Sequence, residues 1–229
     1  MAAYDLEEQE QLAEIKAWWK QYGERLVHVI TVIALLVFAW QGWNWYQRNQ
    51  VGQASVVYGA LQQAVQAKDT QRIKAASGEL LEKFSGTPYA VLGALNSAKA
   101  MIEEGDAQTA KAQLLWAAEH GKEELRDLAR LRAAAVLLDE KAYDQAIAQL
   151  NGASSTSFEI RFQDMRGDIL AAQGKKTEAV SAFQTVLSKL GELEKSARSD
   201  GVGTEWQGES NAILRDLIGQ KIDALGGGK

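Results

Sequence analysis

The chain has 229 residues, a formal net charge of −5 at pH 7 and no cysteine. Its first 25 residues carry six acidic and three basic side chains, which leaves only −2 for the rest of the chain. So nearly neutral a chain lacks the basic surface that nucleic acids require, and we expect no nucleic-acid partner. The absence of cysteine excludes disulfide bonds and thiol chemistry, and it is compatible with an oxidising compartment.

An uncharged segment near the N-terminus predicts one transmembrane helix in contact with membrane lipid. The segment runs from Leu26 to Gln47, between Arg25 and Arg48. As a helix rising about 1.5 Å per residue, it would cross the roughly 30 Å of hydrocarbon in a bilayer. Aromatic residues typical of membrane–water interfaces flank it: they are Trp18, Trp19, Tyr22, Trp40, Trp43, Trp45 and Tyr46. A buried core helix is the alternative interpretation, whereas a cleaved signal would end in small residues.

The basic residues beside the span predict its orientation. Three precede it and one follows it closely: Lys16, Lys20 and Arg25, then Arg48. Because lysine and arginine near a span tend to stay in the cytoplasm, we expect residues 1–25 to form a cytoplasmic arm. Residues 48–229 would then lie outside the membrane, in the periplasm of a bacterium.

The cytoplasmic arm has an amphipathic pattern of its own. Four apolar residues within residues 6–23 recur at helical spacing, at Leu12, Ile15, Trp19 and Tyr22. Such a helix either lies in the membrane interface and continues into the span, or docks onto a cytoplasmic or membrane partner.

The chain beyond the span predicts an all-α fold built from helical hairpins. It is rich in alanine, contains one proline and spaces its apolar residues three and four apart. Turns recur with an alanine five residues later, at Ala110, Ala146 and Ala179. The most complete unit reads Gly167, Gly174, Ala179 and Phe183. The small residues would let paired helices touch, and the phenylalanine would fill the gap to the next hairpin.

This spacing resembles the tetratricopeptide repeat, whose period is about 34 residues. The predicted architecture is a single N-terminal transmembrane helix followed by a tetratricopeptide-like solenoid of α-hairpins. The expected repeats span about 53–86, 91–124, 127–157 and 160–191. A terminal helix at about 206–225 would cover the last repeat with one apolar face, formed by residues 213, 214, 217, 218, 222 and 225. A generic alanine-rich helical bundle would be the alternative.

Candidate catalytic groups are few, and we expect no enzyme, no cofactor and no metal site. The chain has two histidines, His28 and His120, which lie far apart in the sequence, and no cysteine to complete a metal site with either. Residues 203–210 have the glycine spacing of a phosphate-binding loop, but Glu209 stands where that loop needs lysine. A membrane-bound enzyme would need a polar cleft with converging titratable groups.

The whole chain resembles the YfgM family of bacterial inner-membrane proteins. The resemblance rests on residues 18–23, on the aromatic stretch at 40–46, on residues 163–175 and on the closing helix at 221–225. It implies an ancillary subunit of the SecYEG protein-conducting channel that associates with a membrane-anchored, PpiD-like periplasmic chaperone. The family also implies help in handing over emerging proteins and a link to envelope-stress signalling.

Stacked hairpins create a concave surface that suits peptide or partner binding, which predicts an interaction module. By the repeat alignment, the candidate partner surface consists of Lys99, Leu131, Arg161, Asp164 and Asp168. Ordinary surface exposure or packing between helices explains the same residues equally well. A scaffold or regulator of another envelope process, such as cytochrome maturation, division or stress signalling, is the alternative function.

Alkaline carbonate washing tests the transmembrane prediction. We expect the intact chain to stay in the membrane pellet, because a lipid-embedded apolar helix does not depend on electrostatic attachment. Immunoblotting of pellet and supernatant measures the distribution. Release of the intact chain into the supernatant would contradict the prediction.

Overall fold

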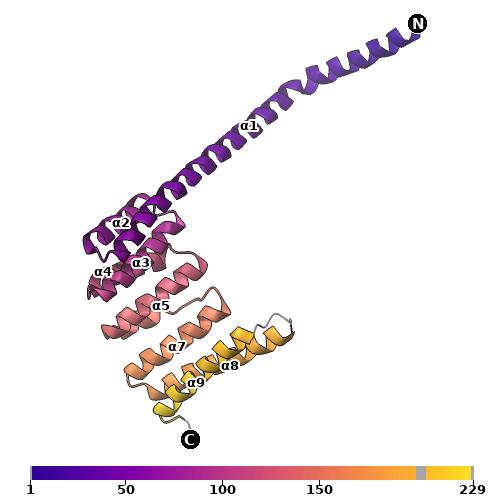
Figure 1. The fold of residues 1–229 in the computed structure, drawn as a ribbon. Helices are drawn as coiled ribbons and strands as arrows, with labels where there is room; N and C mark the ends of the chain where they lie inside the picture. Colours follow the sequence, from indigo (N-terminus) through magenta and orange to yellow (C-terminus); the bar gives the residue numbers. More distant parts are fainter. Residues whose placement is uncertain (1, 200–204, 228–229) are drawn as a thin grey trace. The chain divides into compact units, whose positions relative to one another are not determined.

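The computed structural model describes residues 2–199 and 205–227, with side chains described at residues 12, 16–196 and 209–227. Within these residues all regular structure is helical (Figure 1). The helices are α1 (Ala2–Gln66), α2 (Thr70–Lys83), α3 (Pro88–Glu103), α4 (Ala107–His120), α5 (Glu123–Asp139), α6 (Tyr143–Gln149), α7 (Thr156–Ala172), α8 (Lys176–Ser199) and α9 (Glu205–Ala224). The chain forms two compact units, Met1–Gly52 and Gln53–Lys229.

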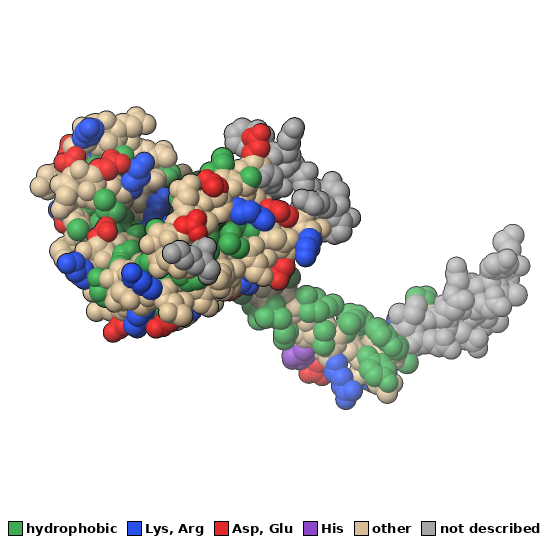
Figure 2. Space-filling model, turned by 90° about the horizontal axis from the view of Figure 1, so that it is seen from below, with side chains coloured by type: hydrophobic (Ala, Val, Ile, Leu, Met, Phe, Trp, Pro, Cys, Tyr) green, Lys and Arg blue, Asp and Glu red, His purple; other side chains and the backbone are tan. Residues whose placement is uncertain are grey.

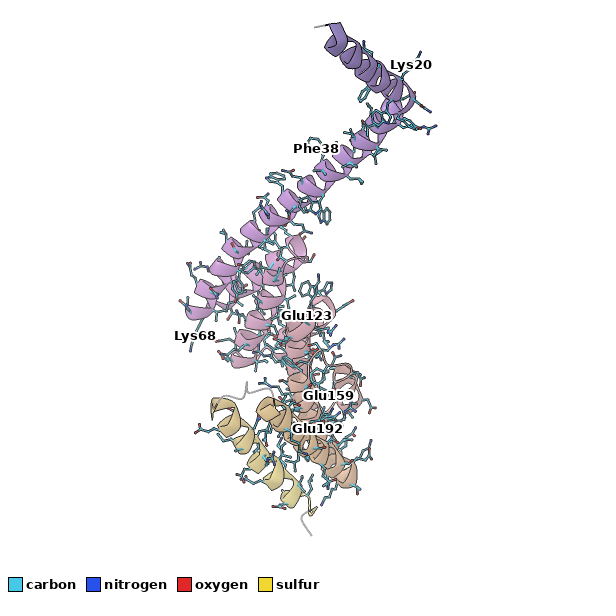
Figure 3. The ribbon with its side chains drawn as sticks, turned by 90° about the vertical axis from the view of Figure 1, so that its right-hand side faces the viewer. Lys20, Phe38, Lys68, Glu123, Glu159 and Glu192 are labelled. Carbon is cyan, nitrogen blue, oxygen red and sulfur yellow. The ribbon has the colours of Figure 1, made fainter. Side chains whose placement is uncertain are left out.

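The first unit contains an apolar stretch of helix α1 whose side chains are exposed among the described residues. The segment Lys16–Gln66 contains an 18-residue window with a mean hydropathy of 1.9, and none of that window is buried. Phe38 on this helix is 75% exposed, and apolar side chains line the same stretch in Figures 2 and 3. A core helix of a soluble protein would bury such a window. The exposure therefore favours lipid as its surroundings, and α1 provides a single membrane anchor.

Aromatic side chains pair along α1 on both sides of its most apolar stretch. The rings of Trp18 and Tyr22 lie 5.9 Å apart, and those of Trp43 and Tyr46 lie 6.2 Å apart. The indole of Trp19 lies over Gly23, where an added Cβ would come within 3.0 Å of the ring. All the aromatic residues predicted to lie at the interface are exposed along this helix.

The second unit consists of successive hairpins that end on α9. Four of its turns share one backbone conformation, with positive φ at Lys68, Gly105, Lys141 and Gly174. At each turn the following N–H donates to a carbonyl five residues back, as in Asp106 N to Met101 O at 2.8 Å. This is the Schellman ending of a helix, in which a left-handed residue satisfies the last carbonyls. The same turn therefore recurs at intervals of 33 to 37 residues.

Small side chains allow the helices of each hairpin to approach closely. Ala110, Ala146 and Ala179, the alanines that recur after the turns, are fully buried. In the last hairpin an added Cβ on Gly167 would lie 2.4 Å from the ring of Phe183. Phe183 thus packs on its own hairpin partner, and it shares an apolar cluster with residues of α9. The sequence predicts a contact of Phe183 with the next element, and the structure adds a contact within its own hairpin.

Ion pairs join the second helix of one hairpin to the turn of the next. The Lys74 ammonium on α2 lies 2.7 Å from the carboxylate of Asp106, and Lys111 on α4 lies 2.6 Å from that of Glu140. Asp106 also caps α4 by accepting from the backbone N–H of Thr109. Hydrogen bonds from Lys74 and Thr109 lower the pKa of Asp106 to about 2. These contacts set the relative position of neighbouring hairpins.

The third hairpin departs from the regular pattern because α6 has only seven residues. Its connection to α7 is held by charged side chains. The buried carboxylate of Asp127 accepts the backbone N–H of Ser154 at 2.5 Å. Arg130 donates to the carbonyl of Asn151 at 2.9 Å, and Arg166 donates to the carbonyl of Leu150 at 3.2 Å. The connection is therefore fixed by hydrogen bonds.

Helix α9 covers the last hairpin with a narrower face than the sequence predicts. Ile218 and Ile222 are buried, and Leu214 and Leu225 are partly buried against the same cluster. Ile213 is 72% and Leu217 45% exposed, so these two residues lie off the packed face. The single six-residue face expected from the sequence is therefore wrong. Successive residues of a helix point 100° apart around its axis, so six apolar residues spread around α9. Only those on one side of the helix pack against α8.

Replacing Gly167 by alanine tests the close approach within the last hairpin. The new Cβ would overlap the ring of Phe183, so we expect a loss of about 1–3 kcal/mol in the free energy of unfolding. Thermal denaturation followed by circular dichroism measures it. In the control Gly78→Ala on α2, no neighbouring atom lies within 4 Å of the new Cβ. That variant should gain about 0.5–1 kcal/mol from helix propensity. Equal effects of both substitutions would contradict the prediction.

Candidate functional site

The residues of the candidate partner surface lie on the first helices of three successive hairpins. Lys99 is on α3, Leu131 is on α5, and Arg161, Asp164 and Asp168 are on α7. Lys99 and Arg161 are exposed, and the other three are partly buried. Helix α5 contacts both α3 and α7, so the three helices form one continuous layer of the second unit.

The middle of this layer is apolar and its ends are charged. Leu128, Leu131 and Leu138 recur at helical spacing on α5 and are each partly buried, which places them on one face of that helix. On α3, Ile102 is 48% exposed one turn from Lys99. On α7, the guanidinium of Arg161 lies 5.8 Å from the ring centre of Phe158. Such a surface suits an apolar segment flanked by charged residues.

Asp164 and Asp168 come together around a lysine that the sequence reasoning did not assign. The Lys221 ammonium, on α9, lies 2.6 Å from the carboxylate of Asp164 and 2.9 Å from that of Asp168. It also lies 5.2 Å from the ring centre of Phe183, within range of a cation–π contact. The two aspartates therefore bind the terminal helix, and Leu131 packs partly against a core cluster, so Lys99 and Arg161 are the exposed members of the candidate partner surface.

A signal for this contact did exist in the sequence. Lys221 lies between Ile218 and Ile222, within the apolar face of the terminal helix. A charged residue on such a face needs a buried partner of opposite charge. Asp164 and Asp168, one helical turn apart on α7, are that partner.

Burial and charge act in opposite directions at this cluster. Burial raises the pKa of the Asp168 carboxyl and outweighs the hydrogen bond from Lys221, while the charge of Asp164 adds to the rise. Burial alone would lower the pKa of Lys221, but the hydrogen bonds to Asp164 and Asp168 outweigh it and raise that pKa. Two carboxylates facing one ammonium leave the cluster with one excess negative charge when all three are ionised.

A separate hollow of about 500 Å³ lies where α5 and α7 begin. It is lined by Lys122, Glu123, Glu124, Leu125, Ser154 and Ser155. No histidine is among these lining residues to activate a serine hydroxyl for attack. Over the described residues, no group of three or more histidine, cysteine or acidic side chains is arranged to hold a metal ion.

The two histidines make local contacts within their own helices. His120 stacks on Trp116 with ring centres 4.3 Å apart, and its Nδ1 lies 3.0 Å from the Trp116 carbonyl oxygen. His28 Nδ1 lies 2.6 Å from the carbonyl oxygen of Glu24. Glu209 is exposed, and the side chains of residues 203–208 lie outside the described residues.

Two substitutions at the α7–α9 cluster are expected to change stability differently. Lys221→Met leaves two adjacent carboxylates without their cation, so we expect a loss of roughly 1–2 kcal/mol after allowance for solvent exposure. Asp168→Asn keeps an acceptor for Lys221 and removes the excess charge. It should therefore leave stability unchanged at pH 7 or raise the melting temperature by about 2 °C at most.

The stability change caused by Asp168→Asn should depend on pH. Folding raises the pKa of Asp168. The contribution of this carboxyl to the free energy of unfolding is therefore fully favourable below its ordinary pKa of 3.8, and it is lost as the pH rises through the pKa of the folded state. Any increase in melting temperature caused by Asp168→Asn at pH 7 should accordingly vanish below about pH 4. Melting curves of the wild type and both variants across this range measure it, and a gain that grows in acid would contradict the prediction.

The chain matches a family model described as a tetratricopeptide repeat-like domain over residues 16–200. It is 32% identical over 194 residues to a Haemophilus influenzae protein, covering 84% of this chain and 95% of the relative. A Neisseria gonorrhoeae protein is 29% identical over 233 residues, covering 98% of this chain and 100% of the relative. An Escherichia coli K12 protein is 29% identical over 182 residues, covering 77% and 85% respectively.

All three relatives are named ancillary SecYEG translocon subunit. They are named for an assembly and not for a reaction, in agreement with the prediction that the chain is not an enzyme. The all-α, tetratricopeptide-like fold expected from the sequence is confirmed by the family model and by the helical hairpins. The chain therefore belongs to the YfgM family of tetratricopeptide repeat-like proteins, together with these relatives.

Proposed function

We propose that the chain is an ancillary subunit of the SecYEG translocon, anchored in the bacterial inner membrane by α1. The observation that carries the proposal is the match along 98% of the chain to a relative of that name, which includes the anchor as well as the repeats. An interaction domain fits such a role, since it needs surfaces and not reacting groups.

The anchor and the repeat domain have complementary physical roles in this proposal. A single span confines the repeat domain to the bilayer, so that a weak contact with a membrane channel becomes effectively intramolecular. The apolar stretch on α5, between Lys99 and the charged end of α7, provides a contact surface of moderate hydrophobicity. Such surfaces favour transient binding over permanent assembly.

The orientation and the chaperone link are further parts of the proposal. Lys16, Lys20 and Arg25 before the span favour a cytoplasmic N-terminus, which would place the repeat domain in the periplasm. There the candidate partner surface would bind a membrane-anchored, PpiD-like chaperone and assist the handover of proteins leaving the channel. The family resemblance supports this role, and the exposed Lys99 and Arg161 are the side chains expected to contact the partner.

Site-specific photocrosslinking in intact cells tests the proposal. A photoreactive residue at Lys99, Leu131 or Arg161 is expected to capture a subunit of the translocon or the PpiD-like chaperone. Gln184, exposed on α8, is the matched control and should give at least about tenfold less adduct, since contact is needed for capture. Adducts identified by mass spectrometry that contain only other envelope proteins would contradict the proposal.

A further inference from the structure

We infer that the surface beneath α9 is a second docking site, built for an amphipathic helix of a partner protein with two basic residues one turn apart. In this inference α9 is the resident occupant that the partner helix displaces. The inference rests on the proposed function, because it adds a site to the proposed interaction domain.

The charges of the receiving surface define the first requirement for a ligand. Asp164 and Asp168 lie four residues apart on α7, and the only ammonium bound to them in the described part of the chain is that of Lys221. Their side chains are 24% and 36% exposed, so the pair is sheltered and still reachable from solvent. One cation against two carboxylates leaves an unmatched negative charge, which a ligand with two basic residues at the same spacing would neutralise.

The apolar contacts define the second requirement. Ile218 and Ile222, three residues before and one residue after Lys221, are buried in a cluster with Phe183, Val186 and Leu190 of α8. The site thus accepts a helix with isoleucine-like side chains on either side of a lysine. Lys221 additionally approaches the Phe183 ring, which favours a cation at this point of the apolar surface.

The resident helix is held by few contacts, which makes it displaceable. Two apolar side chains of α9 are buried among the described residues, whereas α8 buries five: Ala179, Ala182, Phe183, Val186 and Leu190. The remaining ion pair to α8, between Arg215 and Glu194, is exposed and contributes little. Helix α9 also leaves Ile213 and Leu217 in solvent, which a partner helix with a polar outer face would avoid.

Peptide binding to the full-length chain in detergent micelles tests the inference. The probe is a fluorescent peptide of residues 209–227 carrying Leu217→Lys, which adds a second lysine one turn before Lys221. Fluorescence anisotropy measures its dissociation constant for the wild-type chain and for two variants. The matched control peptide carries Lys221→Gln in addition.

We expect saturable binding that depends on the carboxylate pair. The chain variant Lys221→Gln, whose resident helix has lost its cation, should bind the probe about tenfold more tightly than the wild type, as expected for one charge-assisted hydrogen bond. The double variant Asp164→Asn, Asp168→Asn should lose the binding, and the control peptide should bind at least about tenfold more weakly. Circular dichroism checks that each variant is folded.

Three results would overturn the inference. The first is equal binding of the probe to the wild type and to the double variant. The second is unchanged affinity of the Lys221→Gln chain for the probe peptide, although hydrogen exchange at residues 209–225 shows that α9 is released. The third is a Lys221→Gln chain that dimerises in analytical ultracentrifugation, which would assign the site to α9 of a second copy. Translocon crosslinks at Lys99 and Leu131 would persist in each case, so failure here is distinct from failure of the proposed function.

Discussion

Close contact between the two helices of each hairpin is the constraint on which the repeat domain depends. Ala110, Ala146 and Ala179 have no exposed surface, and Gly167 has no room for a methyl group beside Phe183. The left-handed residue in each turn acts together with these small residues. It fixes the direction in which the second helix leaves the turn, and the small side chain fixes how near that helix comes. Together they give the hairpins a similar shape, except for the third with its short α6, so that successive hairpins can stack.

The same apolar residue types meet two different surroundings in this chain. In the second unit leucine and isoleucine side chains are buried among alanines, as at Leu61, Leu114 and Ile169. Along α1 they are exposed over a continuous stretch that far exceeds the apolar patch a soluble monomer tolerates. The division follows from length and charge, because an uncharged run of 22 residues offers no charged face to solvent and is long enough to cross a bilayer.

The sequence predicts the local features well and the long-range contacts poorly. The turns at Gly105 and Gly174 and the contact at Gly167 could be predicted because each depends on residues close together in the chain. The ion pair of Lys221 with Asp164 spans 57 residues, and it depends on how α9 is rotated about its own axis. That rotation also decides which apolar residues of α9 are buried. The apolar pattern alone does not specify it, because six apolar residues allow several faces, and Lys221 is the local signal that favours one of them.

Charged hydrogen bonds hold the two places where the repeat loses its regularity. Asp127 and Arg166 fix the connection after the short α6, and Lys221 fixes the helix that follows the last hairpin. Regular hairpins have small apolar residues between their helices, and their ion pairs, Lys74 with Asp106 and Lys111 with Glu140, are partly exposed, as is that of Lys221 with Asp164. At an irregular junction apolar contacts alone would let the elements slide, because the hydrophobic effect has no preferred direction. A charged hydrogen bond has a preferred direction, and its loss would leave a charge unpaired, so it favours one arrangement of the junction over the others.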